Sequence, residues 1–284
     1  MTSAPFPADD EPGVRLARVE VEVTATPEQV WEAIATGPGL AAWFVPAEVD
    51  GREGGEIVTH HGAFGSSRGV VTAWEPPHRF VYEEREWSEA DDAPPWATEI
   101  LVEARAGGTC VVRLASGFLT GGEEWGDELG STYDGWRQGM ANLRLYLTHF
   151  AGQPTTSMNV SHVTAGPAAA VRERLLDLLG LHDAAAGQRR RVPAAAGAPP
   201  LAGIVEDAPP DHLALRIDEP TGGHVVLSVH GRHDVPGAGG GDAEVVISLR
   251  CYLYGDAGPS VRARDEGAWE TWLEERFPAP AVAG

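Results

Sequence analysis

The feature that most constrains the fold is a change of hydrophobic period near residue 124. Before it, from Ala47 to Phe118, short segments alternate apolar and polar residues between turn residues, as in an antiparallel meander. Beyond it, apolar residues recur at the spacing of one helix face: Trp125, Leu129, Trp136, Met140, Leu143 and Leu147. The pattern predicts a long amphipathic helix over 124–150, laid on an antiparallel sheet, which is an α+β fold.

The strands and first helices are predicted from the same alternation and from turn residues. A strand over 14–23 precedes a helix over 27–35, which Pro27 opens after Thr26 and which Gly37-Pro38-Gly39 ends. A second short helical turn carries Leu40, Trp43 and Phe44. Gly and Pro pairs then separate six further predicted strands, over 47–50, 56–61, 69–74, 80–87, 98–106 and 109–118.

The order of elements recurs in the second half of the chain, which indicates a duplication. Residues 69–78 have a counterpart in residues 203–212, and Pro27 and Pro167 each open a helix after a strand. We therefore expect an N-terminal tail over 1–13, a first domain over 14–151, a linker over 152–157 and a diverged second domain over 158–284. Within the second domain, 194–200 and 236–241 are predicted to be loose loops.

The composition of the chain limits which binding partners and which cellular compartment are expected. Forty-two acidic residues against twenty-one Arg give a net charge of −21, which repels phosphate backbones and anionic lipids, so no nucleic-acid partner is expected. No apolar run is long enough to span a membrane, and residues 1–13 do not resemble a secretory signal. Two cysteines, Cys110 and Cys251, suit a reducing compartment, and we expect a cytoplasmic protein.

Several motifs resemble a known family. They are Pro27-x3-Trp31-x-Ala33-Ile34-Ala35, Pro38-x-Leu40-x2-Trp43-Phe44, Gly69-x-Val71-x4-Pro76-Pro77-x2-Phe80-Val81-Tyr82 and Gly135-Trp136-x3-Met140-x2-Leu143-x2-Tyr146-Leu147. Together with the element order, they are similar to the START-like (SRPBCC) helix-grip superfamily. Within it, they resemble the branch named for the C-terminal domain of the activator of the ninety-kilodalton heat-shock-protein ATPase. The resemblance covers 14–150 well and is weaker over 158–284, where no Trp follows Pro167 at the Trp31 spacing.

The resemblance implies two tandem helix-grip domains, each a curved antiparallel sheet around a long C-terminal helix, with an apolar cavity between sheet and helix. Members of the superfamily bind apolar small molecules, chaperones or substrates. In such a cavity, inward-facing strand residues and the apolar helix face would contact a ligand. The candidate ligand-binding residues are Trp43, Phe44, Tyr82, Glu84, Phe118, Trp136 and Met140, although aromatic residues at these spacings also fill ordinary cores.

Few polar residues are candidates for a catalytic or metal-binding role. If Tyr82 faces inward, alternation puts Glu84 and Glu86 on the same face, where burial would raise their carboxyl pKa values. The acidic run over 83–92 favours the alternative, that the strand has already left the core. His60 and His61 alternate to opposite faces and cannot together chelate one metal, while Ser67, in Gly-Ser-Ser-Arg-Gly, is interpreted as part of a turn.

No motif predicts a catalytic constellation, a metal site or a cofactor. We expect the chain to bind an apolar small molecule or lipid-like ligand. The alternatives are a chaperone-type protein regulator, which would use its acidic surface on a protein partner, and a cyclase or aromatase-type enzyme, which would need Glu84, Glu86, His60 or His61. Exposed edge strands also suggest a homo-oligomer.

Overall fold

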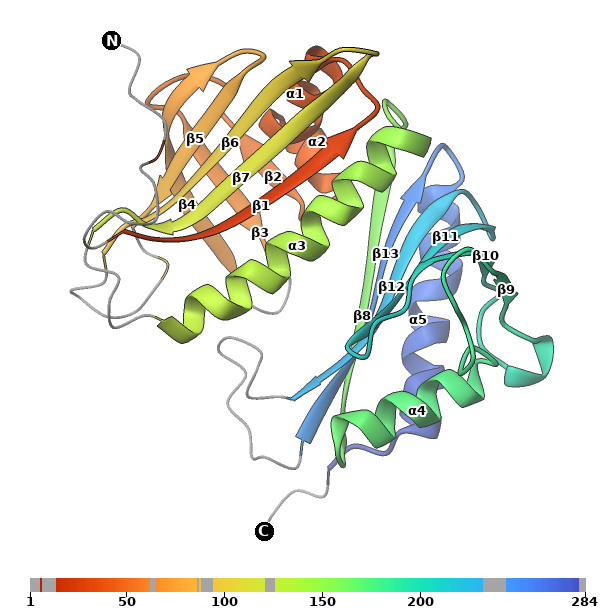
Figure 1. The fold of residues 1–284 in the computed structure, drawn as a ribbon. Coiled ribbons are helices and arrows are strands. Elements are labelled where there is room, and N and C mark those ends of the chain that lie inside the picture. The colour runs from red at the N-terminus through yellow and green to blue at the C-terminus, as the bar shows by residue number, and fades with distance from the viewer. Residues whose placement is uncertain are drawn as a thin grey trace. The chain divides into compact units, whose positions relative to one another are not determined.

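Two units, each built around one antiparallel sheet, make up the chain. The computed structural model describes residue 6 and residues 14–61, 65–85, 87, 94–120, 126–231 and 244–280. The chain divides between Gly152 and Gln153 into unit 1 and unit 2 (Figure 1). The loop predicted at 236–241 and, apart from Phe6, the predicted tail lie outside the described residues.

The described strands of unit 1 form a seven-stranded antiparallel sheet in the order β1-β7-β6-β5-β4-β3-β2. Its elements are β1 (Arg15–Val23), α1 (Pro27–Ala35), α2 (Gly37–Ala41), β2 (Ala47–Val49), β3 (Glu56–His60), β4 (Ser66–Glu75), β5 (Arg79–Glu84), β6 (Trp96–Arg105), β7 (Thr109–Phe118) and α3 (Gly126–His149). The predicted meander followed by a long helix is confirmed.

Helix α1 begins where the sequence predicts. Thr26 and Gln29 form a capping box, and Pro27 occupies the first turn, where its missing N–H costs nothing. Thr36 then caps α2 through the backbone N–H of Gly39. Helix α2 ends at Ala41, so Trp43 and Phe44 follow the helix rather than lie within it.

Helix α3 presents its apolar face to the core of unit 1 and packs against β1 (Figure 1). Trp136, Met140 and Leu143 are buried on this face, while the predicted contacts of Trp125 and Leu129 lie outside the described side chains. Asn142, also buried, donates a hydrogen bond of 3.2 Å to the backbone carbonyl of Trp43. This bond ties the helix to the segment after α2.

Unit 2 repeats the plan with a six-stranded sheet in the order β8-β13-β12-β11-β10-β9. Its elements are β8 (Thr155–Ala165), α4 (Ala168–Leu178), β9 (Arg189–Arg191), η3 (Ala194–Ala196), β10 (Ala202–Asp207), β11 (His212–Glu219), β12 (Gly223–Gly231), β13 (Glu244–Tyr254) and α5 (Gly258–Arg276). The tandem helix-grip fold is therefore confirmed.

Two segments of unit 2 differ from the sequence prediction. Thr155, Thr156 and Ser157, expected in a linker, pair with β13 as the start of β8. The segment 194–200 is not a loose loop: it contains η3, and the carbonyl of Ala196 accepts a 2.9 Å hydrogen bond from the indole of Trp272. Neither the extended pairing nor the tertiary hydrogen bond is visible in local composition.

The two units share the register of one strand pair. Gly69 of β4 lies opposite Glu84 of β5, and Gly203 of β10 lies opposite Ile217 of β11. Two residues further along, both pairings shift register, after Val71 in unit 1 and after Val205 in unit 2. The sequence match between 69–78 and 203–212 thus marks the same strand in both units.

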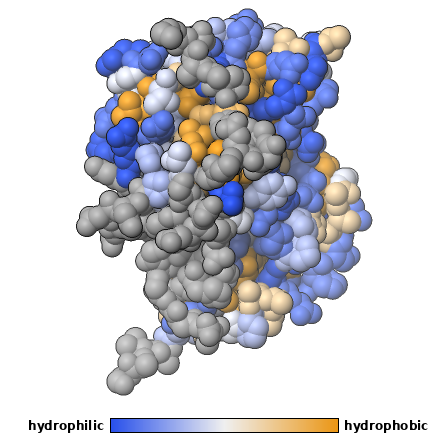
Figure 2. Space-filling view, turned by 60° about the vertical axis from the view of Figure 1, so that its left-hand side comes forward, coloured by the Kyte–Doolittle hydropathy of each residue, from blue (hydrophilic) through white to orange (hydrophobic). Residues whose placement is uncertain are grey.

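The coloured surface in Figure 2 is mostly hydrophilic, with smaller hydrophobic areas between. This agrees with the high net charge of the chain. Val70 and Tyr133 are the large hydrophobic side chains that stand exposed among the described residues. No helix in the described part of the chain is long and apolar enough to cross a membrane.

The shared glycine gives a test of the repeat. A Cβ atom on Gly203 would lie 2.1 Å from the carbonyl oxygen of Arg216, and that backbone cannot move aside without breaking the strand pair. We expect Gly203→Ala to lower the free energy of unfolding by about 1–3 kcal/mol, the usual cost of overpacking.

Guanidinium unfolding followed by tryptophan fluorescence would measure the effect. The control is Gly267→Ala, on the exposed face of α5, where a Cβ meets nothing within 4 Å. This substitution should be neutral or should raise the stability by up to about 1 kcal/mol, because Ala favours the helix. An equal effect of the two substitutions would contradict the packing argument.

Candidate functional site

The candidate site lies on one face of the unit 1 sheet, which we call the inner face. On β5, Phe80 faces Trp31 of α1, with ring centroids 6.4 Å apart, and α1 in turn contacts α3. Because side chains alternate along a strand, Tyr82 and Glu84 share this face with Phe80. The predicted orientation of β5 is therefore observed.

Four of the seven predicted residues gather beside α3. The ring of Phe44 stacks on Trp136, with centroids 4.8 Å apart and planes 25° apart, and it lies 5.7 Å from the ring of Trp43. Met140, one turn along α3 from Trp136, is also buried. Trp43 is fixed from the other side by a 2.9 Å hydrogen bond from its indole to the carbonyl of Ala33.

The other three predicted residues, Tyr82, Glu84 and Phe118, lie on the sheet. Phe118, Trp96 and Glu84 lie side by side on β7, β6 and β5, and the rings of Phe118 and Trp96 are 4.7 Å apart. In the next inward row, Ser116 and Thr98 lie beside Tyr82. The predicted site residues thus form two groups, one on α3 with the segment after α2 and one on β5 and β7.

Side chains outside the predicted ligand-binding set connect the two groups. The ring of His61 lies 6.1 Å from Phe44, and its Nε2 is 3.0 Å from the hydroxyl of Thr59. Thr59 lies opposite Ser67, whose hydroxyl donates a hydrogen bond to the carboxylate of Glu84. The prediction that Ser67 belongs to a turn is corrected: β4 already begins at Ser66, because Ser67 pairs with β3.

Glu84 stays with the core instead of leaving it. It is the last residue of β5, is half-buried, and its pKa is raised by burial, an effect that the hydrogen bond from Ser67 partly offsets. Its neighbour Glu83 points to the opposite face and lies 3.9 Å from Arg85. Glu86, the second predicted carboxylate, lies outside the described residues. A carboxyl group with a raised pKa can serve as a proton donor or as a polar anchor.

A row of hydrogen-bonding side chains crosses the inner face. The indole of Trp96 donates to the hydroxyl of Ser116 over 2.8 Å, and the hydroxyls of Ser116 and Thr98 are 2.8 Å apart. Thr98 and Ser116 are 1% and 0% exposed. Neither Thr98 nor Ser116 was among the predicted site residues. Alternation along each strand could have placed Thr98 and Ser116 inward, but the pairing that joins them to Tyr82 depends on the register between strands.

The remaining candidates do not form a metal site. His60 turns away from His61 and lies 2.8 Å from Ser66 and 3.4 Å from Glu48. Within the described ranges, no group of three or more His, Cys, Asp or Glu side chains is placed to hold a metal ion.

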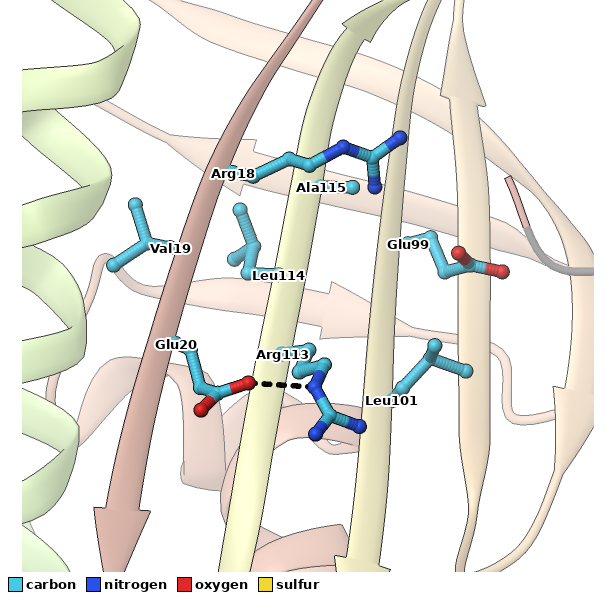
Figure 3. A pocket seen from close by; sticks show the side chains of 8 residues that line it. All are labelled: Arg18, Val19, Glu20, Glu99, Leu101, Arg113, Leu114 and Ala115. Atoms are coloured by element: carbon cyan, nitrogen blue, oxygen red, sulfur yellow. Dashed lines mark hydrogen bonds and ion pairs between the residues drawn. The ribbon is translucent and has the colours of Figure 1, made fainter. Parts of the chain in front are cut away.

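A pocket of about 200 Å³ opens on the opposite, outer face of the same sheet (Figure 3). Its lining comes from β1, β6 and β7, and its charged groups are paired. Arg113 binds Glu20 and Glu103 at 2.6 Å each, and the buried carboxylate of Glu99 accepts from Arg79 at 2.7 Å and from the backbone N–H of Phe6 at 3.0 Å. Because these charges already bind one another, we place the candidate site on the inner face.

Comparisons with known proteins agree with the helix-grip architecture. Residues 24–148 match the family described as "Activator of Hsp90 ATPase homolog 1-like protein". No curated protein matches the chain.

Solved structures of similar fold include a di-domain protein. DynU16, a putative protein in the dynemicin biosynthetic locus, is 18% identical, with 92% of this chain and 98% of that chain covered and a TM-score of 0.42. The di-domain ARO/CYC BexL from the BE-7585A biosynthetic pathway is 13% identical, with 94% and 100% covered and a TM-score of 0.42. The Aha1 dimer from Colwellia psychrerythraea is 16% identical, with 48% and 98% covered and a TM-score of 0.40. At these identities the similarity concerns the fold alone.

The raised pKa of Glu84 predicts a pH dependence of stability. The folded chain binds the proton of Glu84 more tightly than the unfolded chain, so this contribution is fully present below the ordinary value of 4.5 and is lost as the pH rises through the folded pKa. Glu84→Gln, which cannot ionise, should lose less stability between pH 4.5 and neutrality than the wild type. Urea unfolding at a series of pH values would measure this.

The matched control is Glu83→Gln, one residue earlier on the opposite face, which should follow the wild-type profile. Comparing the two variants cancels the titration of the other carboxylates. Parallel profiles for Glu84→Gln and the wild type would show that Glu84 is solvated.

Proposed function

We propose that unit 1 binds an apolar small molecule between its sheet and α3. The match of residues 24–148 to the activator-of-Hsp90-ATPase-homolog family supports this proposal. The observation that carries this proposal is the convergence on the inner face of stacked aromatic rings, around Phe44 and Trp136, with the buried polar row of Tyr82, Thr98 and Ser116. Small-molecule sites combine an apolar lining with a few placed polar groups in this way.

The half-buried residues indicate where a ligand would enter. Phe44, His61, Ser67 and Glu84 are each partly exposed, whereas Tyr82, Thr98 and Ser116 behind them are buried. A ligand would therefore pass the Phe44–Glu84 end of the sheet and place its apolar body against Trp136 and Phe118.

Two alternatives draw on specific features. An enzyme of the cyclase or aromatase type would use Glu84, because burial raises its carboxyl pKa and so favours the protonated form that a general acid needs. The family description suggests the second alternative, a protein regulator. Such a regulator would use the acidic surface of the chain to bind its partner. A cytoplasmic location and self-association belong to the proposal as well, and the buried free thiols of Cys110 and Cys251 suit a reducing compartment.

Substitution of Trp136 tests ligand binding. Trp136→Ala removes the ring that stacks on Phe44 and should weaken binding of the uncharged fluorophore N-phenyl-1-naphthylamine by roughly fivefold or more, as truncation of a central aromatic anchor does. The affinity would be measured by fluorescence titration of the full chain.

The control is Arg144→Ala, on the exposed side of the same helix. It should bind the fluorophore as the wild type does. Binding that is equally strong in both variants would place the fluorophore elsewhere and contradict the proposal, and so would a wild-type chain that does not bind it at all.

A further inference from the structure

Unit 2 serves as an internal comparison for the polar side chains of unit 1. The pairing of Gly69 with Glu84 corresponds to that of Gly203 with Ile217, and the shared register carries the correspondence across both sheets. Six polar inner-face residues of the site have an apolar or thiol counterpart. In order, Thr59, Ser67, Tyr82, Glu84, Thr98 and Ser116 correspond to Val192, Leu201, Leu215, Ile217, Val225 and Cys251.

The comparison shows that the fold does not require these polar groups. The counterparts Leu215, Val225 and Cys251 all belong to the buried hydrophobic core of unit 2, where the same strand pairings form. A buried hydroxyl gains little over an apolar side chain of similar shape and costs stability wherever a hydrogen bond is left unmade. The polar row of unit 1 therefore calls for an explanation other than sheet formation.

The row is short of acceptors by one hydrogen. The indole of Trp96 donates to Ser116, the hydroxyls of Ser116 and Thr98 share a hydrogen that either can donate, and Thr98 hydrogen-bonds Tyr82, which lies directly opposite on β5. Four donor hydrogens thus serve three hydrogen bonds, so one hydroxyl hydrogen of the row is left over. It costs less on Tyr82, which is 5% exposed and lies on the same face as the half-buried Glu84, than on Ser116, which is 0% exposed.

Such a chain strengthens its last donor. Each hydroxyl that accepts a hydrogen bond becomes a better donor itself, most of all in a surrounding of low dielectric constant. Tyr82 is only 5% exposed, and burial raises its pKa, so its hydroxyl keeps the proton that it would donate. Tyr82 lies two residues before Glu84 on the same face of β5, on the route that a ligand would take.

We propose that the Tyr82 hydroxyl donates a hydrogen bond to an acceptor oxygen of the bound ligand, so that unit 1 selects apolar molecules that carry a carbonyl or similar oxygen, whereas unit 2 has Leu215 at the equivalent position. This inference rests on the proposed function and adds the specificity of the same site. Trp96, Ser116 and Thr98 are positioning residues, because they act through Tyr82.

Two ligands of equal shape test the proposal. 2-Acetylnaphthalene carries a carbonyl oxygen where 2-isopropenylnaphthalene carries a methylene group. In Tyr82→Phe the affinity for the isopropenyl compound should stay near wild type, whereas the affinity for the acetyl compound should fall roughly three- to tenfold, the effect of one neutral hydrogen bond. Both affinities would be measured by competition with N-phenyl-1-naphthylamine on the full chain.

The control is Tyr133→Phe, the same substitution at an exposed position of α3, which should leave both affinities unchanged. A loss confined to the acetyl compound and to Tyr82→Phe supports the proposal. A wild-type ratio of the two affinities in Tyr82→Phe overturns it while leaving the proposed function intact. If the wild type binds neither compound nor the fluorophore, the proposed function itself fails, and the specificity falls with it.

Discussion

The antiparallel register of β5, β6 and β7 is the constraint on which the candidate site depends. Side chains of a strand alternate between faces, so a shift of one residue would turn Tyr82 and Glu84 outward and bring Glu83 inward. The paired rows Tyr82–Thr98–Ser116 and Glu84–Trp96–Phe118 exist only in the observed register. The bulge after Val71 and the close approach of strands at Gly69 fix β4 against β5, and so help to hold this register.

The inner face of unit 1 combines two opposed demands. The stacked rings of Phe44 and Trp136 and the buried Phe118 favour a dry interior, in which hydrogen bonds are strong and unpaired polar groups are costly. Within it, the carboxyl of Glu84 is accommodated by a hydrogen bond from Ser67 and by its place near the edge. Unit 2, with Ile217 and Leu201 at the equivalent positions, avoids this cost.

Much of the site could be predicted from residue patterns. Pro27 after Thr26 predicted α1, the stripe from Trp136 to Leu147 predicted α3, and alternation from Phe80 predicted that Tyr82 faces inward; each depends on neighbours close in sequence. The acidic run after Glu83 misled the sequence analysis about Glu84, because local charge does not reveal that Ser67, seventeen residues away, supplies a hydrogen bond. Ser67 itself was assigned to a turn for the same reason.

The sequence by itself determined the kinds of element, their order, the duplication and the aromatic residues of the core, because hydrophobic period and turn residues act over a few positions. Only the tertiary structure decided which side chains meet. Register and helix placement bring Phe44 onto Trp136 and join Trp96, Ser116, Thr98 and Tyr82 into one row, and both follow from the packing of segments that lie far apart in the chain. The same physics explains why the two halves look alike in sequence pattern yet differ in the polarity of their inner faces: the shared pattern specifies the sheet, and the side chains opposite one another across strands specify its chemistry.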